Sequence, residues 1–537
     1  MTTHRVSLLA VAGALAAALS APGPAVAAEP NLPMPSPEAL YRSAVRTVEP
    51  KREGTGEQFC WNAAWSMRLF VQAYEAWGES SWLDWGVKYY DYCVGKMATG
   101  PDGYKGWIGP MGRAAWADVH VGDAILLDRM LEFSELVLKD PALKAKYAEP
   151  ANRYVQVARK HLIEKWDRRG TWREDGPYGA YVSFNRYCEP GKLDQWKALP
   201  EGQTEKQGLT LPFNKQNDVA QCCLKLYRIT GEKLYLDKAQ KIFAYMRSRF
   251  QYVADKDYYV WNYWEPFGPW DVDLAKKTTR HWMNVHGYRN YQAGEIGQIA
   301  EAYHTGIVFT PLDIERIVNT NLKVMWNQDK ADPKYVNSNA LLPQPVLTPE
   351  QRKAQEEAER NNPYAKEGRA GTLWTALDDF SQPVRDLEAV RMARPSRNSH
   401  AQIGRAYYYK VTLKTPASPA RRYAPDAKVE QAPVSSCLSL TVATVMPQAI
   451  GDKPSVVLCK SRIDNDLEVA VWSADGKDKK FVLHKGKIEG GTDGLVGIFI
   501  LQWDGADPAT KARLPKGNYR MRWTVPDGYR EFPVVIP

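Results

Sequence analysis

The chain of 537 residues lacks the features that mark several large classes of protein. After residue 19 no stretch approaches 18 uninterrupted apolar residues, so the sequence predicts no membrane-spanning helix. Its 7 cysteines form no C-x-x-C pair and no zinc-like spacing. The Lys and Arg residues are dispersed and form no basic run. We therefore expect no membrane partner, no nucleic-acid partner, and no metal or other cofactor.

The first residues predict export from the cytoplasm. A short basic start precedes the apolar run Val6–Leu19, and Ala25–Ala27 supplies a small-x-small cleavage pattern. The alternative is a membrane anchor, for which the run is short. We expect a signal peptide over residues 1–27, a secreted or periplasmic location, and a possible pairing of Cys437 with Cys459 in that oxidising compartment.

What the chain does contain is an excess of polar aromatic residues and of positive charge. It has 19 Trp and 29 Tyr against 13 Phe. Aromatic rings that carry a polar N–H or O–H group suit surfaces that stack on sugars in water. The alternative is that these rings fill a large helical core. The formal net charge of +9 favours an anionic partner.

One helical hairpin is repeated in the sequence. Residues 74–88 and residues 227–241 both match Y-x3-G-E-x2-[WY]-L-D-x3-K. The pattern predicts a helix ended by glycine, a tight turn, and a second helix with Asp in its first turn. Further hairpins are expected over 120–166 and 291–326. Recurring hairpins indicate a repeat architecture in which each hairpin buries one face against its neighbours.

The hydrophobic period changes near the C-terminus. Residues 36–414 are predicted to form the helical domain, and residues 415–433 are typical of a linker. Residues 434–537 follow a period of two with turn signals between the runs, which predicts an antiparallel β-sandwich of about seven strands. The expected fold class is therefore mainly α: an (α/α) toroid of helical hairpins followed by a C-terminal β-sandwich.

The hairpin signature, the export signal and the trailing β module resemble the (α/α)-toroid polysaccharide lyases. Six-hairpin glycosidases and uronyl epimerases have related toroid folds. Three segments carry the resemblance: residues 119–127, residues 211–218, and Tyr263–Glu265 followed by His286–Tyr291. The resemblance implies a polysaccharide lyase that cleaves a uronic-acid polymer, such as alginate or glucuronan, by β-elimination. We expect an anionic polysaccharide as its partner and a monomeric protein.

Elimination requires a group that neutralises the uronate carboxylate, a base and an acid. His286, Tyr288 and Tyr291 are the predicted acid and base residues, and Asn214 is predicted to bind the carboxylate. The predicted substrate-binding residues are Asn217, Arg289, His120 and Trp264. Six of them have a structural alternative: Asn214 as a helix cap, His286 as a turn residue, Tyr288, Tyr291 and Trp264 as core aromatics, and His120 as a solvated capping residue.

Hydrolysis is the rival hypothesis. A glycosidase needs two carboxyl groups roughly 5–10 Å apart, and the sequence offers Asp118, Asp123, Glu265 and Glu295. A third hypothesis is a glycan-binding protein without catalysis. A uronyl epimerase shares the proton abstraction of a lyase, and the sequence does not separate the two. It also leaves open which uronate is recognised and whether action is endo or exo.

Overall fold

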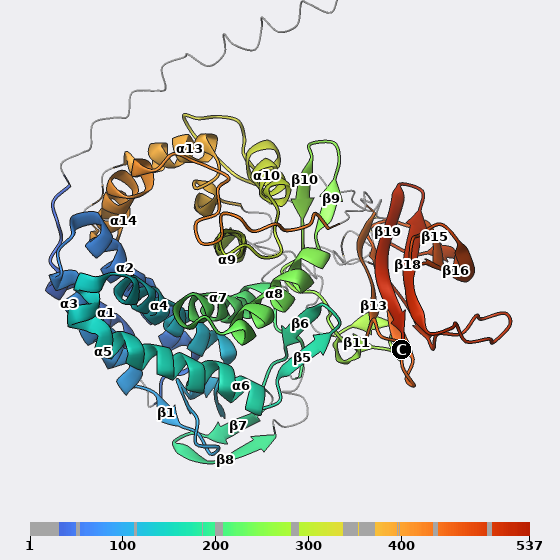
Figure 1. The fold of residues 1–537 in the computed structure, drawn as a ribbon, viewed down its shortest axis with the longest axis horizontal. Helices are drawn as coiled ribbons and strands as arrows, with labels where there is room; N and C mark the ends of the chain where they lie inside the picture. The colour runs from blue at the N-terminus through green and yellow to red at the C-terminus, as the bar shows by residue number, and fades with distance from the viewer. Residues whose placement is uncertain are drawn as a thin grey trace, which may run out of the picture.

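The protein consists of a ring of helices followed by two β-sheets (Figure 1). The computed structural model describes residues 32–49, 54–111, 115–184, 186–198, 208–280, 289–336, 371–394, 398–432, 439–490 and 497–537, together with single positions 349, 353 and 396. The predicted signal peptide, residues 1–27, lies outside the described residues.

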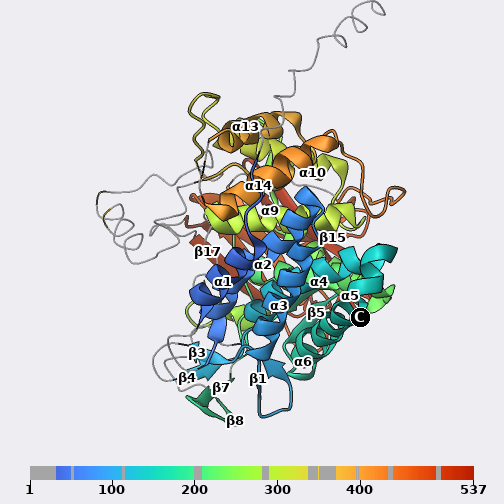
Figure 2. The ribbon, with the colours of Figure 1, turned by 90° about the vertical axis from the view of Figure 1, so that its left-hand side faces the viewer.

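Inner and outer helices alternate around the ring. The inner helices are α2 (Gly56–Trp77), α4 (His120–Lys139), α7 (Phe213–Thr230) and α9 (Arg289–His304), and the outer helices are α1 (Pro37–Val48), α3 (Ser81–Gly95), α5 (Pro141–Ala158), α8 (Lys233–Ser248) and α10 (Pro311–Asn319). Neighbouring inner helices pack on one another in chain order. The circle is completed by η5 (Thr375–Leu377), α13 (Gln382–Met392) and α14 (Ser399–Lys410), and α14 packs on α2 (Figure 2).

The contrast in burial between the layers is clearest between α4 and α10. In α4, 15 of 20 residues are buried, whereas α10 buries four of nine, along one face. A helix that is buried almost all round must lie inside other structure, and an amphipathic helix covers it. Two outer helices continue as π-helical turns, α5 through η1 (Arg159–Glu164) into α6 (Lys165–Arg168), and α10 into η3 (Thr320–Met325).

The repeated hairpin motif forms as its sequence predicts. Gly78 and Gly231 end α2 and α7 in the left-handed conformation, with φ of 75° and 76°. Each backbone N–H donates to a tyrosine carbonyl four residues earlier, at 2.7 Å. In the first copy Trp82 stacks on Trp77 at 6.0 Å between ring centroids, which fixes the outer helix against the inner one.

Connections differ in length at the two ends of the ring. The turns from an inner to an outer helix are short, while residues 96–119, 169–212 and 249–288 lead into α4, α7 and α9. These long connections contain β1 (Ala98–Thr99), β2 (Lys105–Gly106), β3 (Gly109–Met111), β4 (Ala115–Ala117), β5 (Trp172–Asp175), β6 (Tyr178–Tyr181), β7 (Arg186–Glu189), β8 (Lys192–Ala198), β9 (Gln251–Val253), β10 (Tyr258–Val260), η2 (Pro269–Asp271), β11 (Val272–Asp273) and β12 (Thr278–Thr279). Long loops on a rigid scaffold are where functional residues concentrate.

The C-terminal part contains two antiparallel sheets. One has the order β13 (Leu440–Met446), β14 (Ser455–Ser461), β17 (Gly497–Trp503), and the other β16 (Lys479–Ile488), β15 (Asn465–Ser473), β18 (Gly517–Val525), β19 (Gly528–Ile536). Their facing side chains form one core, including Val457, Val469 and Trp523. The predicted order of helical hairpins followed by antiparallel strands is thus confirmed for the described residues.

The two parts are packed together. Val272 of the helical part lies in a cluster with Val442, Val456 and Leu458 on the outer side of the three-stranded sheet. Residues 415–432, predicted as a linker, lie along the ring, where the Arg421 guanidinium donates to backbone carbonyls of Tyr303 and Phe309. In the described part of the chain, no helix has the length and apolar character needed to cross a bilayer.

Candidate active site

Each of the four inner helices carries a carboxyl group within its first seven residues. These groups are Glu57 on α2, Asp123 on α4, Asp218 on α7 and Glu295 on α9. The long connections meet at this end of the ring: the Thr55 N–H donates to the Ile108 carbonyl at 3.3 Å, and the Phe213 N–H to the Tyr263 carbonyl at 3.0 Å. The four carboxyl groups therefore mark the end of the ring where a site is expected.

Two of these four carboxyl groups are neutralised by cations. Glu57 forms an ion pair with Lys215 at 2.9 Å. Asp123 forms one with Lys165 at 2.6 Å, and its Oδ2 also accepts from the Trp166 indole at 2.9 Å. The side chains of Lys165 and Asp123 are 0% and 1% exposed, so this pair belongs to the core.

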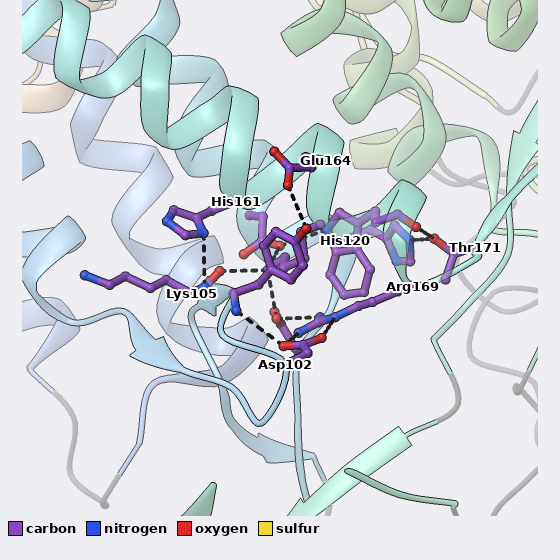
Figure 3. A network of polar contacts seen from close by, with 12 residues as sticks. Asp102, Lys105, His120, His161, Glu164, Arg169 and Thr171 are labelled. Carbon is purple, nitrogen blue, oxygen red and sulfur yellow. Dashed lines mark hydrogen bonds and ion pairs between the residues drawn. The ribbon is translucent and has the colours of Figure 1, made fainter. Parts of the chain in front are cut away.

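The Lys165 ion pair is part of a network that reaches the first long connection (Figure 3). Lys165 also binds Asp118 at 2.7 Å, and Arg169 links Asp118 to Asp102. Near the surface, Tyr104 donates to Glu164 at 2.8 Å. Asp118 and Asp123 are two of the four carboxylates considered for hydrolysis. Through this network they link the β1–β2 connection to η1 and α6.

His120 also lies in this region, enclosed by protein. Its ring stacks on Trp166 at 3.7 Å between centroids, and its Nε2 is 2.9 Å from Thr171 Oγ1. Burial, followed by the charges of Lys165 and Arg169, lowers its pKa well below the usual value. The structure therefore places this predicted substrate-binding residue, 3% exposed, as a neutral, packed imidazole.

Asp218 and Glu295 differ from the other two carboxyl groups because neutral donors hold them. The Gln298 amide donates to Asp218 Oδ1 at 2.7 Å, and the Trp261 indole donates to Glu295 Oε2 at 2.7 Å. Neither has an ion-pair partner within 4.0 Å among the described residues. Glu295 Oε1 is buried and has no hydrogen-bond partner in the same ranges. Within these ranges neither group is therefore held by a charged partner; Glu295 is 0% exposed, and Asp218 is partly exposed.

Their surroundings raise both pKa values. Burial, and next the charge of Asp128, raises the pKa of Asp218 to about 8. Burial, and to a lesser degree the charge of Asp218, raises the pKa of Glu295 to about 8. Arg129 and Lys215 favour the ionised form of Asp218, whereas only the Trp261 indole favours ionised Glu295. More charged neighbours therefore favour the ionised form of Asp218 than that of Glu295.

There is open space beside this pair. Asp218 is partly exposed on the side of α7 that faces the ring. Gly294 precedes Glu295 on α9, and a Cβ atom built there would have no neighbouring heavy atom within 4 Å. The next position on that face of α9 is Gly297, where the nearest such atom is the Ala376 Cβ at 3.9 Å. Two glycines thus leave room next to the carboxyl pair.

The two predicted asparagines lie on the same helix as Asp218. Asn214 is 4% exposed, its backbone carbonyl accepts from Gln298 at 3.2 Å, and its Oδ1 has no partner among the described residues. Asn217 is fully buried, and its amide lies 3.1 Å from the Met246 sulfur on the outer helix α8. Asn214 is therefore close to the carboxyl pair, while Asn217 faces the outer layer.

The structure describes part of the predicted aromatic cluster. Tyr291 stacks on Tyr263 at 4.6 Å between centroids, and Tyr263 in turn adjoins the start of α7 through the Phe213 N–H. Trp264 is 7% exposed and its indole donates to the Thr210 carbonyl at 2.7 Å. His286, Tyr288 and the side chain of Arg289 lie outside the described residues. Tyr291 and Asn214 thus belong to neighbouring segments.

Glu265, the third carboxylate considered for hydrolysis, connects the two domains. Its Oε2 accepts from Lys460 of β14 at 2.8 Å, and both side chains are 0% exposed. The Asn262 amide donates to the other oxygen at 2.5 Å. The same loop carries Trp261, the hydrogen-bond donor to Glu295. The β part therefore fixes the loop that orients Glu295.

Metal and disulfide predictions concern residues that the structure describes only in part. Within the described ranges, no group of three or more His, Cys, Asp or Glu side chains has an arrangement that could hold a metal ion. Cys459 is buried, and Cys437 lies outside those ranges, so their pairing stays a prediction.

Comparison with known proteins gives little further information. No protein-family model and no curated protein matches the sequence. The chain is similar to the GH76 alpha-1,6-mannanase of Salegentibacter sp. HEL1_6, with a TM-score of 0.35 and 11% identity over 70% of this chain and 98% of that chain. For a GH76 alpha-mannanase of Bacteroides thetaiotaomicron the TM-score is 0.33 and the identity 9%, over 65% and 68%. Neither is described as a lyase, and likenesses this distant carry no functional conclusion.

The buried pair between domains gives a stability prediction. Replacing Lys460→Met leaves the Glu265 carboxylate buried and unpaired, so the free energy of unfolding should fall by about 3–5 kcal/mol. Adding Glu265→Gln should restore much of the loss. The matched control is Lys479→Met, whose partly exposed pair with Glu468 should contribute at most about 1 kcal/mol. Equal effects of the two lysine variants in chemical denaturation would contradict the assignment.

Proposed function

We propose that the protein is a glycoside hydrolase, in which Glu295 is the general acid and Asp218 the carboxylate that acts with it. The observation that carries the proposal is the contrast among the four inner-helix carboxyl groups. Glu57 and Asp123 are neutralised by lysines, whereas Asp218 and Glu295 accept hydrogen bonds from neutral groups only. Glycoside hydrolysis requires two carboxyl groups in one site, of which one is protonated and acts as the acid while the other is ionised.

In the proposed reaction Glu295 gives its proton to the glycosidic oxygen as the bond between that oxygen and the anomeric carbon breaks. The Asp218 carboxylate stabilises the positive charge that develops on the sugar and takes a proton from the attacking water. We place the substrate in the open space at Gly294, which precedes Glu295 in the chain. The predicted signal peptide leads us to propose that the reaction takes place outside the cytoplasm.

Hydrolysis replaces elimination as the preferred reaction. Elimination depends on His286 and Tyr288, which lie outside the described residues, and on Tyr291, whose ring stacks on Tyr263. The described residues supply an acid and a carboxylate, and the substrate we propose is a polysaccharide.

Substitution of the pair should abolish hydrolysis. Glu295→Gln and Asp218→Asn should each lower kcat/KM by about 10²–10⁴-fold, since each removes a positioned proton donor or acceptor. Asp237→Asn, an exposed position on the outer helix of the α7–α8 hairpin, is the matched control and should retain full activity. Activity is measured as new reducing ends from a panel of neutral and acidic polysaccharides.

The nature of the product decides between the two reactions. Saturated reducing-end products, lost in both variants, support hydrolysis. Products with the ultraviolet absorbance of an unsaturated uronate, formed equally by the wild type and by Glu295→Gln, would contradict it and favour elimination.

The pH dependence should follow from the raised pKa values. The reaction needs ionised Asp218 and protonated Glu295, both with a pKa of about 8, so kcat/KM should be bell-shaped with its maximum near pH 8. In Trp261→Phe the hydrogen bond that favours ionised Glu295 is lost. The pKa of Glu295 should then rise, and the alkaline limb of the profile should move to higher pH while the acid limb stays.

The control for this profile is Trp472→Phe in the β part, which should move neither limb. A downward shift of the alkaline limb in Trp261→Phe, or an equal shift of both limbs, would contradict the assignment of Glu295 as the acid.

A further inference from the structure

Helix α2 has one continuous polar and exposed stripe. Spacings of three and four residues place its members on a single face: Gln58, Asn62, Trp65, Arg68, Gln72 and Glu75. The rest of the helix is covered by α1, α3, α4 and α14. The stripe is therefore the face of α2 that no neighbouring helix covers, and it faces the inside of the ring.

Electrostatic neighbours confirm the direction of this face. The charge of Arg68 interacts with Arg129 and Glu132 on α4, with Tyr407 on α14, and with Arg391 on α13. These three helices are arranged with α2 around the ring (Figure 1). A side chain within range of all three points to the centre of the ring rather than to its outer surface.

In the described part of the chain no hydrogen bond and no ion pair within 4.0 Å holds Arg68, although the charge of Glu132 lies within its range. Its neighbour Arg129 pairs with Glu132 at 3.0 Å and with Asp128 at 3.4 Å. The Arg68 side chain is accessible to solvent but surrounded by the helices of the ring; this desolvation, and next the charge of Arg129, lowers its pKa. A guanidinium that faces another cation in a partly enclosed space is stabilised by an anion, and its planar fork matches a carboxylate.

Trp65 lies one turn before Arg68 on the same stripe. Its relative exposure is 71%, the highest among the exposed large apolar side chains of the described residues. An indole left in water inside a ring has no packing role, but it offers a flat apolar surface with a polar edge, which suits the face of a sugar. Side chains three residues apart on a helix can contact one ligand together.

We propose that Trp65 and Arg68 form a subsite for a uronic acid residue of the substrate. The indole stacks on the sugar ring, and the guanidinium binds its carboxylate through two parallel hydrogen bonds. The charge of Arg129 acts on Arg68, and the charge of Asp218 acts on Arg129, so the subsite lies in the same part of the ring as the proposed catalytic carboxylate. The inference rests on the proposed function in that this sugar belongs to the chain cleaved there, and it makes the substrate an acidic polysaccharide.

Calorimetric titration tests the subsite without turnover. The Glu295→Gln protein is titrated with short oligomers of mannuronate, guluronate and glucuronate, and with the same oligomers after reduction of their carboxyl groups. At least one acidic oligomer should bind more tightly than its reduced form. Arg68→Gln in this background should weaken that oligomer by about 10- to 100-fold and leave the reduced form unchanged.

Two further variants separate the roles. Trp65→Ala should weaken the acidic and the reduced oligomer by the same factor, since stacking does not depend on the carboxylate. Arg42→Gln, an exposed arginine on α1 paired with Glu38, is the matched control and should change nothing. Circular dichroism and thermal unfolding confirm that each variant is folded.

Three results would overturn the subsite: no binding of any uronate oligomer, equal binding of acidic and reduced forms, or an Arg68→Gln variant that binds the acidic oligomer like its parent. The hydrolase proposal fails separately. If Glu295→Gln still cleaves polysaccharide while Arg68→Gln loses uronate binding, the subsite stands and the catalytic assignment falls. If Glu295→Gln is inactive and Arg68→Gln binds uronate normally, the catalytic assignment stands and the subsite is wrong.

Discussion

The burial of the inner helices is the constraint on which the site depends. Neighbouring inner helices cover their flanks and outer helices cover their backs, so only a narrow face and the first turns can carry polar groups that meet a ligand. A carboxyl group elsewhere on these helices must be neutralised, because an unpaired buried charge is costly. Lys165 and Lys225 do this for Asp123 and Asp128. Asp218 and Glu295 stand out because no lysine among the described residues forms an ion pair with either of them.

The β part contributes to the site without lying in the ring. Lys460 holds Glu265, and the loop of Glu265 begins with Trp261, the hydrogen-bond donor to Glu295. A buried ion pair adds little net stability, but breaking it is costly, so it fixes one arrangement of the loop. The C-terminal sheets therefore act as a support for the proposed acid, in addition to any role in holding the polysaccharide.

Local sequence patterns predicted the helices and strands of the fold well. The site could not be predicted in the same way, because it depends on contacts between residues far apart in the chain. The glycines at 78 and 231 end their helices because a left-handed turn is a local property, and the period of two marks the strands for the same reason. Glu295 was among four candidate carboxylates, but Lys165, the lysine that neutralises both Asp118 and Asp123, lies over 40 residues away in the chain. Asp218 was missed because no local pattern shows which carboxyl group stays without a cation. The spacing of Trp65 and Arg68 in the sequence places them on one face of a helix. Only the arrangement of the helices in the ring shows that this face points inward.

The most direct test of the account is a crystal structure of the Glu295→Gln protein with a bound oligosaccharide. We expect a glycosidic oxygen within hydrogen-bond distance of the substituted side chain, with the anomeric carbon of the same bond beside Asp218. A sugar chain bound inside the ring but away from both residues, or bound to the β-sheets alone, would contradict the proposed catalytic pair.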